Sequence, residues 1–291
     1  MPNLHLVDAP YELFRAWFGA PPKRSPDGRE VGASRGVAYT LAYLLREEGA
    51  THVGCATDHV VRSFRNDLYP GYKTEAGVPE ELLAQFPLVE DLMRAMGFVV
   101  WPMVEFEADD ALAAAAAKLS DQVDKVFVCT VDKDLAQSVR GDQIVLVDRR
   151  RKITLDQAGV VEKFGVEPVA IPDFLALVGD TADGYPGIPG FGKKTAAAVL
   201  RAFGSIEAVP PEATKWPRDI RGTTTLAATL HEHREAALLF KKLATLRLDT
   251  PIHESLADLE WRGPRPELYD MATALGFPDL LDRLPKPRNP R

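Results

Sequence analysis

The chain has 291 residues, of which 46% are hydrophobic and 26% are charged, as is typical of a globular protein with one large core or two domains. No apolar run approaches the length of a membrane helix, and Asp8 interrupts the first short run, so the sequence predicts a cytoplasmic protein with neither a membrane span nor a signal peptide. The net charge of −7 argues against nucleic-acid binding only if the acids are spread evenly, because phosphate binders present a basic surface. Cys55 and Cys129 lie inside apolar runs and are expected to be buried thiols.

The N-terminal half alternates predicted strands and helices, which favours an α/β fold. Short apolar runs predict strands at residues 4–7, 52–56, 98–103, 126–131, 144–147 and 153–155. Apolar residues at helical spacing predict helices at residues 11–18, 37–45, 79–96 and from EFEADD to residue 119. The uninterrupted run at 126–131 is typical of a parallel strand covered on both faces, and the basic run at 149–152 is expected to be the solvated tip of a hairpin.

Acidic residues follow the predicted strands. Asp8 and Asp58 come at the ends of the first two strands, and Asp132 and Asp134 come directly after the fourth. Because ligand sites of open α/β sheets lie beyond the carboxyl ends of the strands, we expect these side chains to converge. The alternative is a coincidence of surface acids.

The segment at residues 63–73 interleaves the cations Arg65 and Lys73 with aromatic residues, as nucleic-acid-binding surfaces do. A solvated connecting segment has the same composition, so both interpretations stay open. Glu107, Asp109 and Asp110 then open a helix, where the helix dipole alone would also favour acids. In a regular helix Asp109 points away from the other two, so all three act together only if Glu107 precedes the first full turn.

The stretch at residues 171–200 joins paired carboxylates to a glycine hairpin. A helical pattern stops at Gly179, and Asp180 and Asp183 follow with a spacing that lets them point to one side. Two adjacent carboxylates resist ionising together unless a cation lies between them, so this pair indicates a metal.

The hairpin GIPGFGKKT leads into an Ala-rich helix whose first turn presents free amide groups and the positive end of the helix dipole. A phosphate would fit there without any base contact, although a plain turn between two helices contains the same residues. Beyond it we expect a loop at 205–225, a helix at 226–246 with His231 and His233 on its surface, and a frayed tail at 285–291.

Several blocks in this order resemble the bacterial 5′-nuclease family, which includes flap endonucleases and the 5′-to-3′ exonuclease domain of bacterial DNA polymerase I. They are VDAPYELFRAWF, TDHVVRSFR, YPGYK, EFEADD, TVDKDLAQ, GDTADGYPGIPGFGKKTA and LHEHREAALLFKKLATL. The resemblance implies a PIN-like α/β fold in which helices flank a mostly parallel central sheet, with a helical arch at about residues 64–97 and a C-terminal helix-hairpin-helix region. The α/β core would cover residues 1–165, and the helical DNA-binding region, with C-terminal helices packing back on the core, would cover residues 166–291.

The resemblance also implies a site for two or more Mg²⁺ or Mn²⁺ ions, with K⁺ as a further ion at the hairpin. Its metal-binding acids are Asp8, Asp58, Glu107, Asp109, Asp110, Asp132, Asp134, Asp180 and Asp183. Arg65 and Lys73 would be catalytic residues at the base of the arch. The duplex backbone would bind at Gly187, Gly190, Gly192, Lys193, Lys194 and Thr195. Ala9, Ala76 and Gly184 depart from the family's usual residues.

The expected activity is metal-dependent hydrolysis of phosphodiesters at 5′ flaps, nicks and free 5′ ends of DNA, and at RNA-DNA primer junctions, by a monomer. A DNA-junction protein of the same fold without turnover is one alternative, which the full set of acids disfavours. A ribonuclease with a similar acid-lined domain is another, although the hairpin and arch segments would then lack a purpose.

Overall fold

The computed structural model describes residues 1–286, so most of the tail for which the sequence predicts fraying lies outside the described residues. A six-stranded sheet has the strand order β3-β2-β1-β4-β5-β6. The strands are β1 (Leu4–Asp8), β2 (His52–Asp58), β3 (Val99–Met103), β4 (Val126–Cys129), β5 (Ile144–Asp148) and β6 (Ile153–Leu155). Neighbouring strands from β3 to β5 are parallel, and β6 is antiparallel to β5, so the prediction of a mostly parallel sheet is confirmed.

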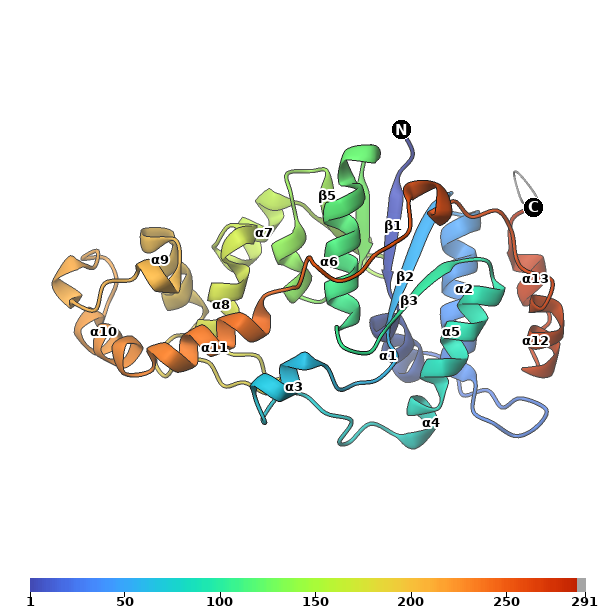
Figure 1. Cartoon of the computed structure of the whole chain (residues 1–291), viewed down its shortest axis with the longest axis horizontal. Helices are drawn as coiled ribbons and strands as arrows, with labels where there is room; N and C mark the ends of the chain where they lie inside the picture. The colour runs from blue at the N-terminus through green and yellow to red at the C-terminus, as the bar shows by residue number, and fades with distance from the viewer. Residues whose placement is uncertain (287–291) are drawn as a thin grey trace.

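Helices cover both faces of the sheet (Figure 1). One face packs against α1 (Ala9–Gly19), α2 (Gly32–Arg46) and α5 (Gln85–Ala95), and the other packs against α6 (Ala108–Leu119). Alternation along each strand explains this, because Val7 points to the first face and Leu6 to the second. Cys55 and Cys129 are buried free thiols, as predicted.

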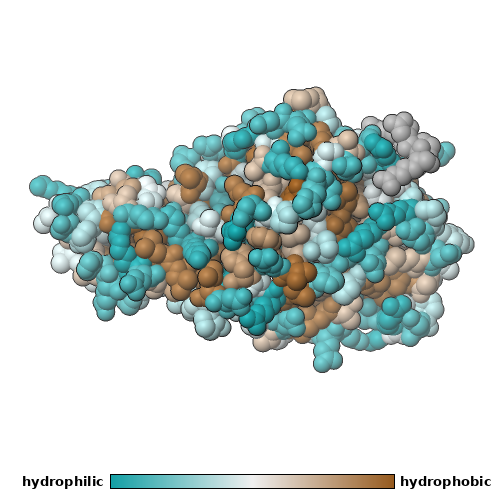
Figure 2. Space-filling model, in the orientation of Figure 1, coloured by the Kyte–Doolittle hydropathy of each residue, from teal (hydrophilic) through white to brown (hydrophobic). Residues whose placement is uncertain are grey.

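The second half of the chain forms a helical extension beside the sheet (Figure 1). Its helices are α7 (Gln157–Phe164), α8 (Ile171–Val178), α9 (Lys193–Phe203), α10 (Thr223–Glu232) and α11 (Arg234–Ala244). The chain then runs back across α6, and α12 (Leu268–Ala274) and α13 (Leu280–Arg283) pack against α5 and α2. In Figure 2 apolar residues gather around the place where α8 and α11 lie in Figure 1, and these two helices pack together.

Short elements connect these helices and strands. They are α3 (Phe64–Leu68), α4 (Glu80–Leu83) and the 3-10 turns η1 (Ser120–Gln122), η2 (Asp134–Ser138), η3 (Pro168–Ala170), η4 (Ile206–Ala208), η5 (Ala213–Lys215) and η6 (Leu256–Leu259). The residues expected to form an arch, 64–97, therefore include α5, whose Val89, Leu92 and Met93 are buried in the core. Within this segment, the residues that do not belong to the helices covering the sheet come before α5.

Three local predictions differ from the structure. The predicted helix at 79–96 is two helices, α4 and α5, because Pro87 cannot donate a hydrogen bond to the carbonyl of Leu83. The predicted helix at 226–246 breaks at His233, which lets α11 pack along α8. Arg149 is not solvated: its side chain is 8% exposed and pairs with Glu48 at 2.8 Å.

No helix within residues 1–286 is long and apolar enough to cross a membrane.

Candidate metal centre and nucleic-acid interface

The acids that follow strands meet at the carboxyl edge of the sheet. Asp8 is the last residue of β1, where its two carboxylate oxygens accept hydrogen bonds from the Tyr11 amide (2.9 Å) and the Thr130 hydroxyl (2.6 Å). Asp58 is the last residue of β2 and accepts a hydrogen bond of 2.7 Å from the Ala108 amide, which joins the strand to the first turn of α6.

The acids at the start of α6 were expected to act together only if Glu107 precedes the first helical turn. Glu107 is the N-cap residue with an extended backbone, so it precedes the first helical turn. Burial raises the pKa of Asp109 well above its ordinary value, and the nearby charges of Asp132, Asp8 and Asp58 add to this effect. These four aspartates form one acidic group.

A second acidic group consists of Asp134, Asp180 and Asp183. One carboxylate oxygen from each lies within 4.8 Å of the others. Asp134 begins η2, while Asp180 and Asp183 lie in the turn after α8 that the bridge between Asp180 and Tyr185 closes. Lys133 donates to Asp180 at 2.5 Å and supplies a positive charge at its rim.

The electrostatics of both groups favour a bound cation. Burial raises the pKa of Asp8 to about 7 and that of Asp58 to about 6. In the second group burial, aided by the charges of neighbouring acids, raises the pKa of Asp183 to about 6 and that of Asp134 well above its ordinary value. Asp134 Oδ1 is also buried without a hydrogen-bond partner. Hard oxygen ligands of this kind suit Mg²⁺ or Mn²⁺, so the residues fit divalent ions.

Lys73 lies beside Glu107 and the second group. Its side chain is 26% exposed, and its ammonium donates to Glu107 at 2.9 Å and lies 3.7 Å from Asp183. Its charge also acts on Asp58 and Asp109 in the first group, where it opposes the rise in pKa. Burial opposes the charge on Glu107, but Lys73, Arg65 and a hydrogen bond from Ser63 together bring the Glu107 pKa below its ordinary value. Glu107 therefore holds Lys73 at the site, with donors on both of its oxygens.

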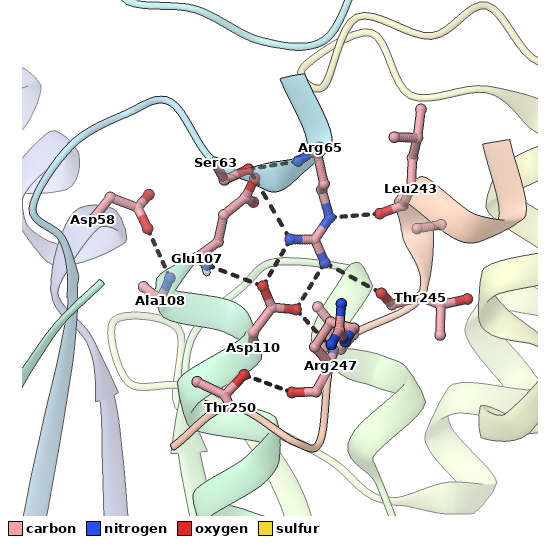
Figure 3. Close-up of polar contacts among 12 residues, drawn as sticks. Asp58, Ser63, Arg65, Glu107, Ala108, Asp110, Leu243, Thr245, Arg247 and Thr250 are labelled. Atoms are coloured by element: carbon pink, nitrogen blue, oxygen red, sulfur yellow. Dashed lines mark hydrogen bonds and ion pairs between the residues drawn. The ribbon is translucent and has the colours of Figure 1, made fainter. Parts of the chain in front are cut away.

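Two of the residues expected at the site have other partners. Asp110 is fully buried, and both of its oxygens accept hydrogen bonds from Arg65, at 2.7 and 2.8 Å (Figure 3). The Arg65 side chain is 1% exposed. Asp110 and Arg65 are therefore paired with each other in this structure, and the metal-ligand and phosphate roles that the resemblance implied for them stay predictions.

The turn after α8 also positions the segment that carries Lys73. The Lys73 amide donates to the Asp183 carbonyl at 3.0 Å. Gly184, with φ of +86°, lies so close to this segment that a Cβ atom there would stand 2.2 Å from the Gly71 carbonyl oxygen. Gly184, which differs from the family's usual residue, thus lies where a side chain would clash with the backbone of Gly71.

The glycine hairpin presents the exposed N-terminus of α9. Gly192, Lys193 and Lys194 are exposed, and no side chain caps the first turn, so its amide groups face outward. The helix lies in the extension, away from the sheet edge (Figure 1). Backbone amides and two ammonium groups there form a surface suited to a phosphate backbone.

Sequence reasoning missed several residues that orient the acids. Thr130 bonds Asp8, Ser63 bonds Glu107 at 2.6 Å, and Lys133 bonds Asp180. Lys133 is flanked by two predicted ligands, which is a usable signal. Nothing in the sequence marks Ser63 or Thr130 in this way, because serine and threonine residues often lie close to acidic residues along a chain.

The comparisons with known proteins cover nearly the whole chain. Residues 3–165 match the family model "5'-3' exonuclease, N-terminal resolvase-like domain", and residues 166–267 match "5'-3' exonuclease, C-terminal SAM fold". DNA polymerase I of Bacillus caldotenax is 35% identical over 292 residues, which is 98% of this chain and 32% of that protein. DNA polymerase I of Pseudomonas aeruginosa is 35% identical over 285 residues, 97% of this chain and 31% of the relative. The chain thus spans about a third of the length of these relatives.

Solved structures share the fold at lower identity. T5 5′-exonuclease with bound zinc has a TM-score of 0.68 and 18% identity, over 97% of this chain and 96% of that one. The catalytic core of Rad2 in complex with a DNA substrate has a TM-score of 0.62 and 15% identity, over 97% of this chain and 92% of that one. These likenesses show the fold. The two family models, which together match residues 3–267, establish that the chain belongs to the 5′-3′ exonuclease family.

Proposed function

We propose that this chain is a divalent-metal-dependent, structure-specific 5′ nuclease. It hydrolyses phosphodiesters at 5′ flaps, nicks and free 5′ ends of DNA, and at RNA primers on DNA, in replication and repair. The observation that carries the proposal is the meeting of two acidic groups at the carboxyl edge of the sheet, with Lys73 beside them. Membership of the exonuclease family and the DNA-bound Rad2 relative support the choice of substrate.

The acids would hold two or more Mg²⁺ or Mn²⁺ ions. Asp8, Asp58, Asp109 and Asp132 form the first candidate set, and Asp134, Asp180 and Asp183 form the second. Bound ions of this type lower the pKa of an attacking water and stabilise the leaving oxygen of an in-line displacement. The metal-bound T5 relative supports this assignment.

The chain's own residues position the substrate. Lys73 places a positive charge beside both acidic groups, where it offsets charge on a phosphate. The N-terminus of α9, with Gly190, Gly192, Lys193, Lys194 and Thr195, binds the duplex backbone without reading bases, and Gly187 shapes the hairpin, where K⁺ is a further candidate ion. The duplex backbone binds at α9 and hydrolysis occurs at the acidic groups. The enzyme therefore selects DNA by the shape of a junction and not by its base sequence.

The products are a 5′-phosphate and a 3′-hydroxyl, and we expect a monomer that acts in the cytoplasm. The full set of acids at the edge of the sheet disfavours the rival of a junction-binding protein without turnover. A ribonuclease leaves the hairpin and its free helix N-terminus without a purpose.

Cleavage of a labelled, all-DNA 5′-flap duplex tests the proposal, beside single-stranded DNA and blunt duplex, with Mg²⁺, Mn²⁺ or EDTA. We expect metal-dependent cuts at or next to the junction, with sizes read on a denaturing gel. Binding without cleavage in either metal would replace the proposal by the junction-binding function. Cleavage restricted to RNA would favour the ribonuclease.

A further inference from the structure

Arg65 is the centre of a buried hydrogen-bond network (Figure 3). Besides its two bonds to Asp110, Arg65 donates from Nε to the Leu243 carbonyl at 2.7 Å and from Nη2 to the Thr245 carbonyl at 3.2 Å. Its guanidinium therefore joins α3 to the first turn of α6 and to residues 243–247, which we call the strap and which run from the end of α11 into the segment after it.

Asp110 completes the same network from the other side. Its Oδ2 accepts a hydrogen bond of 3.0 Å from the Glu107 amide, and its Oδ1 accepts one of 2.8 Å from the Arg247 amide. The strap is held further by the Thr250 hydroxyl, which donates to the Arg247 carbonyl at 2.8 Å. Each carboxylate oxygen of Asp110 thus has two donors.

The network ends at the candidate site. Ser63 caps α3, accepts from the Arg65 amide at 3.3 Å and donates to Glu107 at 2.6 Å. Glu107 in turn holds Lys73. The position of α3 therefore determines where Glu107 and Lys73 lie, and the first turn of α6 determines where Asp109 lies.

A phosphate contact by Arg65 would require this network to open. Asp110 is fully buried, and removing its cation partner would leave an uncompensated charge in the interior. The second ion pair of Arg65, to Glu107 at 3.6 Å, would be lost as well. Lys73, at 26% exposure, reaches the site without any such loss.

We propose that Arg65 is a positioning residue, which together with Asp110 holds α3, the start of α6 and the strap in the arrangement that places Glu107, Asp109 and Lys73 at the site. This role rests on the proposed nuclease function. It differs from a direct contact of Arg65 with the scissile phosphate, because removal of either partner should cause the same defect.

A double-mutant cycle tests the positioning role. We expect Arg65→Ala and Asp110→Ala each to lower the single-turnover rate of flap cleavage in Mg²⁺ by about 100-fold, as small displacements of reacting groups do. The double variant should be no slower than the slower single variant, since the two residues act as one unit. Arg65→Lys should recover little activity, because lysine cannot donate to both oxygens of Asp110.

Two readouts do not depend on cleavage. Mn²⁺ affinity, measured by calorimetry without DNA, should weaken by at least about 10-fold in Arg65→Ala, because Asp109 moves with α6. The salt dependence of DNA binding should keep its slope in Arg65→Ala, whereas Lys194→Ala on the exposed end of α9 should reduce the slope by about one, as the loss of one phosphate contact does.

Multiplying defects in the double variant, or a slope reduced by Arg65→Ala as by Lys194→Ala, would overturn the proposal in favour of a phosphate contact. If either alanine variant does not fold, as judged by circular dichroism, the Arg65→Lys and Asp110→Asn pair gives the same cycle with smaller changes in volume. If the parent protein cuts no flap, the nuclease function fails, while Mn²⁺ affinity and the salt slope still decide the role of Arg65.

Discussion

At the scale of single residues, Asp132 differs from the other acids because it is exposed at the rim of the site. Its carboxylate accepts a hydrogen bond of 2.9 Å from the Asp134 amide. Its charge raises the pKa of Asp8 and Asp109 in one acidic group and of Asp134 and Asp183 in the other. Asp132 therefore faces both groups.

Asp132→Asn should lower the rate of flap cleavage by roughly 100-fold and change DNA affinity little, because asparagine keeps the hydrogen bond but removes the charge that holds cations. Single-turnover cleavage and equilibrium binding measure the two effects. Asp142→Asn is the matched control, since Asp142 is 88% exposed and its ion-pair partner is Lys125. Equal rates for Asp132→Asn and the parent would remove Asp132 from the site.

His5 gives the protein a pH dependence that is separate from the acids. Burial lowers the pKa of His5 from 6.5 to about 4; the charge of Glu48 acts to raise this pKa, and that of Arg149 acts to lower it. Below pH 6.5 the His5 imidazole is protonated in the unfolded chain but stays neutral in the folded chain. His5 therefore reduces the free energy of unfolding as pH falls from 6.5 towards 4. We expect His5→Asn to lose less stability than the parent over this window in urea unfolding. Parallel pH profiles for the two proteins would contradict it.

At the scale of elements, the glycines of the hairpin serve different needs. Gly187 has φ of +75°, and a Cβ atom there would stand 2.4 Å from the Gly179 amide nitrogen. Gly192 has φ of −84°, and a Cβ atom there would meet nothing within 4 Å. The first glycine is required by the turn itself, and the second leaves room for a ligand.

Gly187→Ala should lower the free energy of unfolding by about 1–3 kcal/mol or more, through backbone strain and the clash with Gly179. Gly192→Ala should change it by less than about 0.5 kcal/mol but weaken DNA binding, because a methyl group would stand where a phosphate approaches the amides. Urea unfolding and fluorescence anisotropy measure the pair. Unchanged DNA affinity in Gly192→Ala would place the duplex elsewhere.

At the scale of the whole molecule, metal binding should stabilise the fold, since the acids come from β1, β2, α6, η2 and the turn after α8. Mn²⁺ at 100 times its Kd should add about 2.7 kcal/mol, or roughly 5 °C in Tm, over EDTA. The Asp134→Asn and Asp180→Asn double variant should lose the part of this shift that the second acidic group supplies and keep the parent's metal-free Tm, because it removes buried charge. No shift in the parent would contradict a resident metal.

Much of the architecture was predictable because its signals are local. Apolar runs located all six strands, and the acids at strand ends pointed to one edge of the sheet. Apolar spacing alone did not predict the two broken helices. The break at Ala84 has a local cause in Pro87, which the spacing of apolar residues does not record, whereas the break at His233 accompanies the packing of α11 along α8.

The fold class, the carboxyl edge where the acids meet and the free helix N-terminus could be predicted from short segments, because strand period, chain direction and the conformational freedom of glycine are local properties. Which charged side chains are paired depends on contacts between distant segments. Arg65 and Leu243 are 178 positions apart, and Asp110 and Arg247 are 137 apart. The burial and the partners of a charged side chain depend on such distant contacts, so the ion pair between Arg65 and Asp110 could not be read from either segment alone.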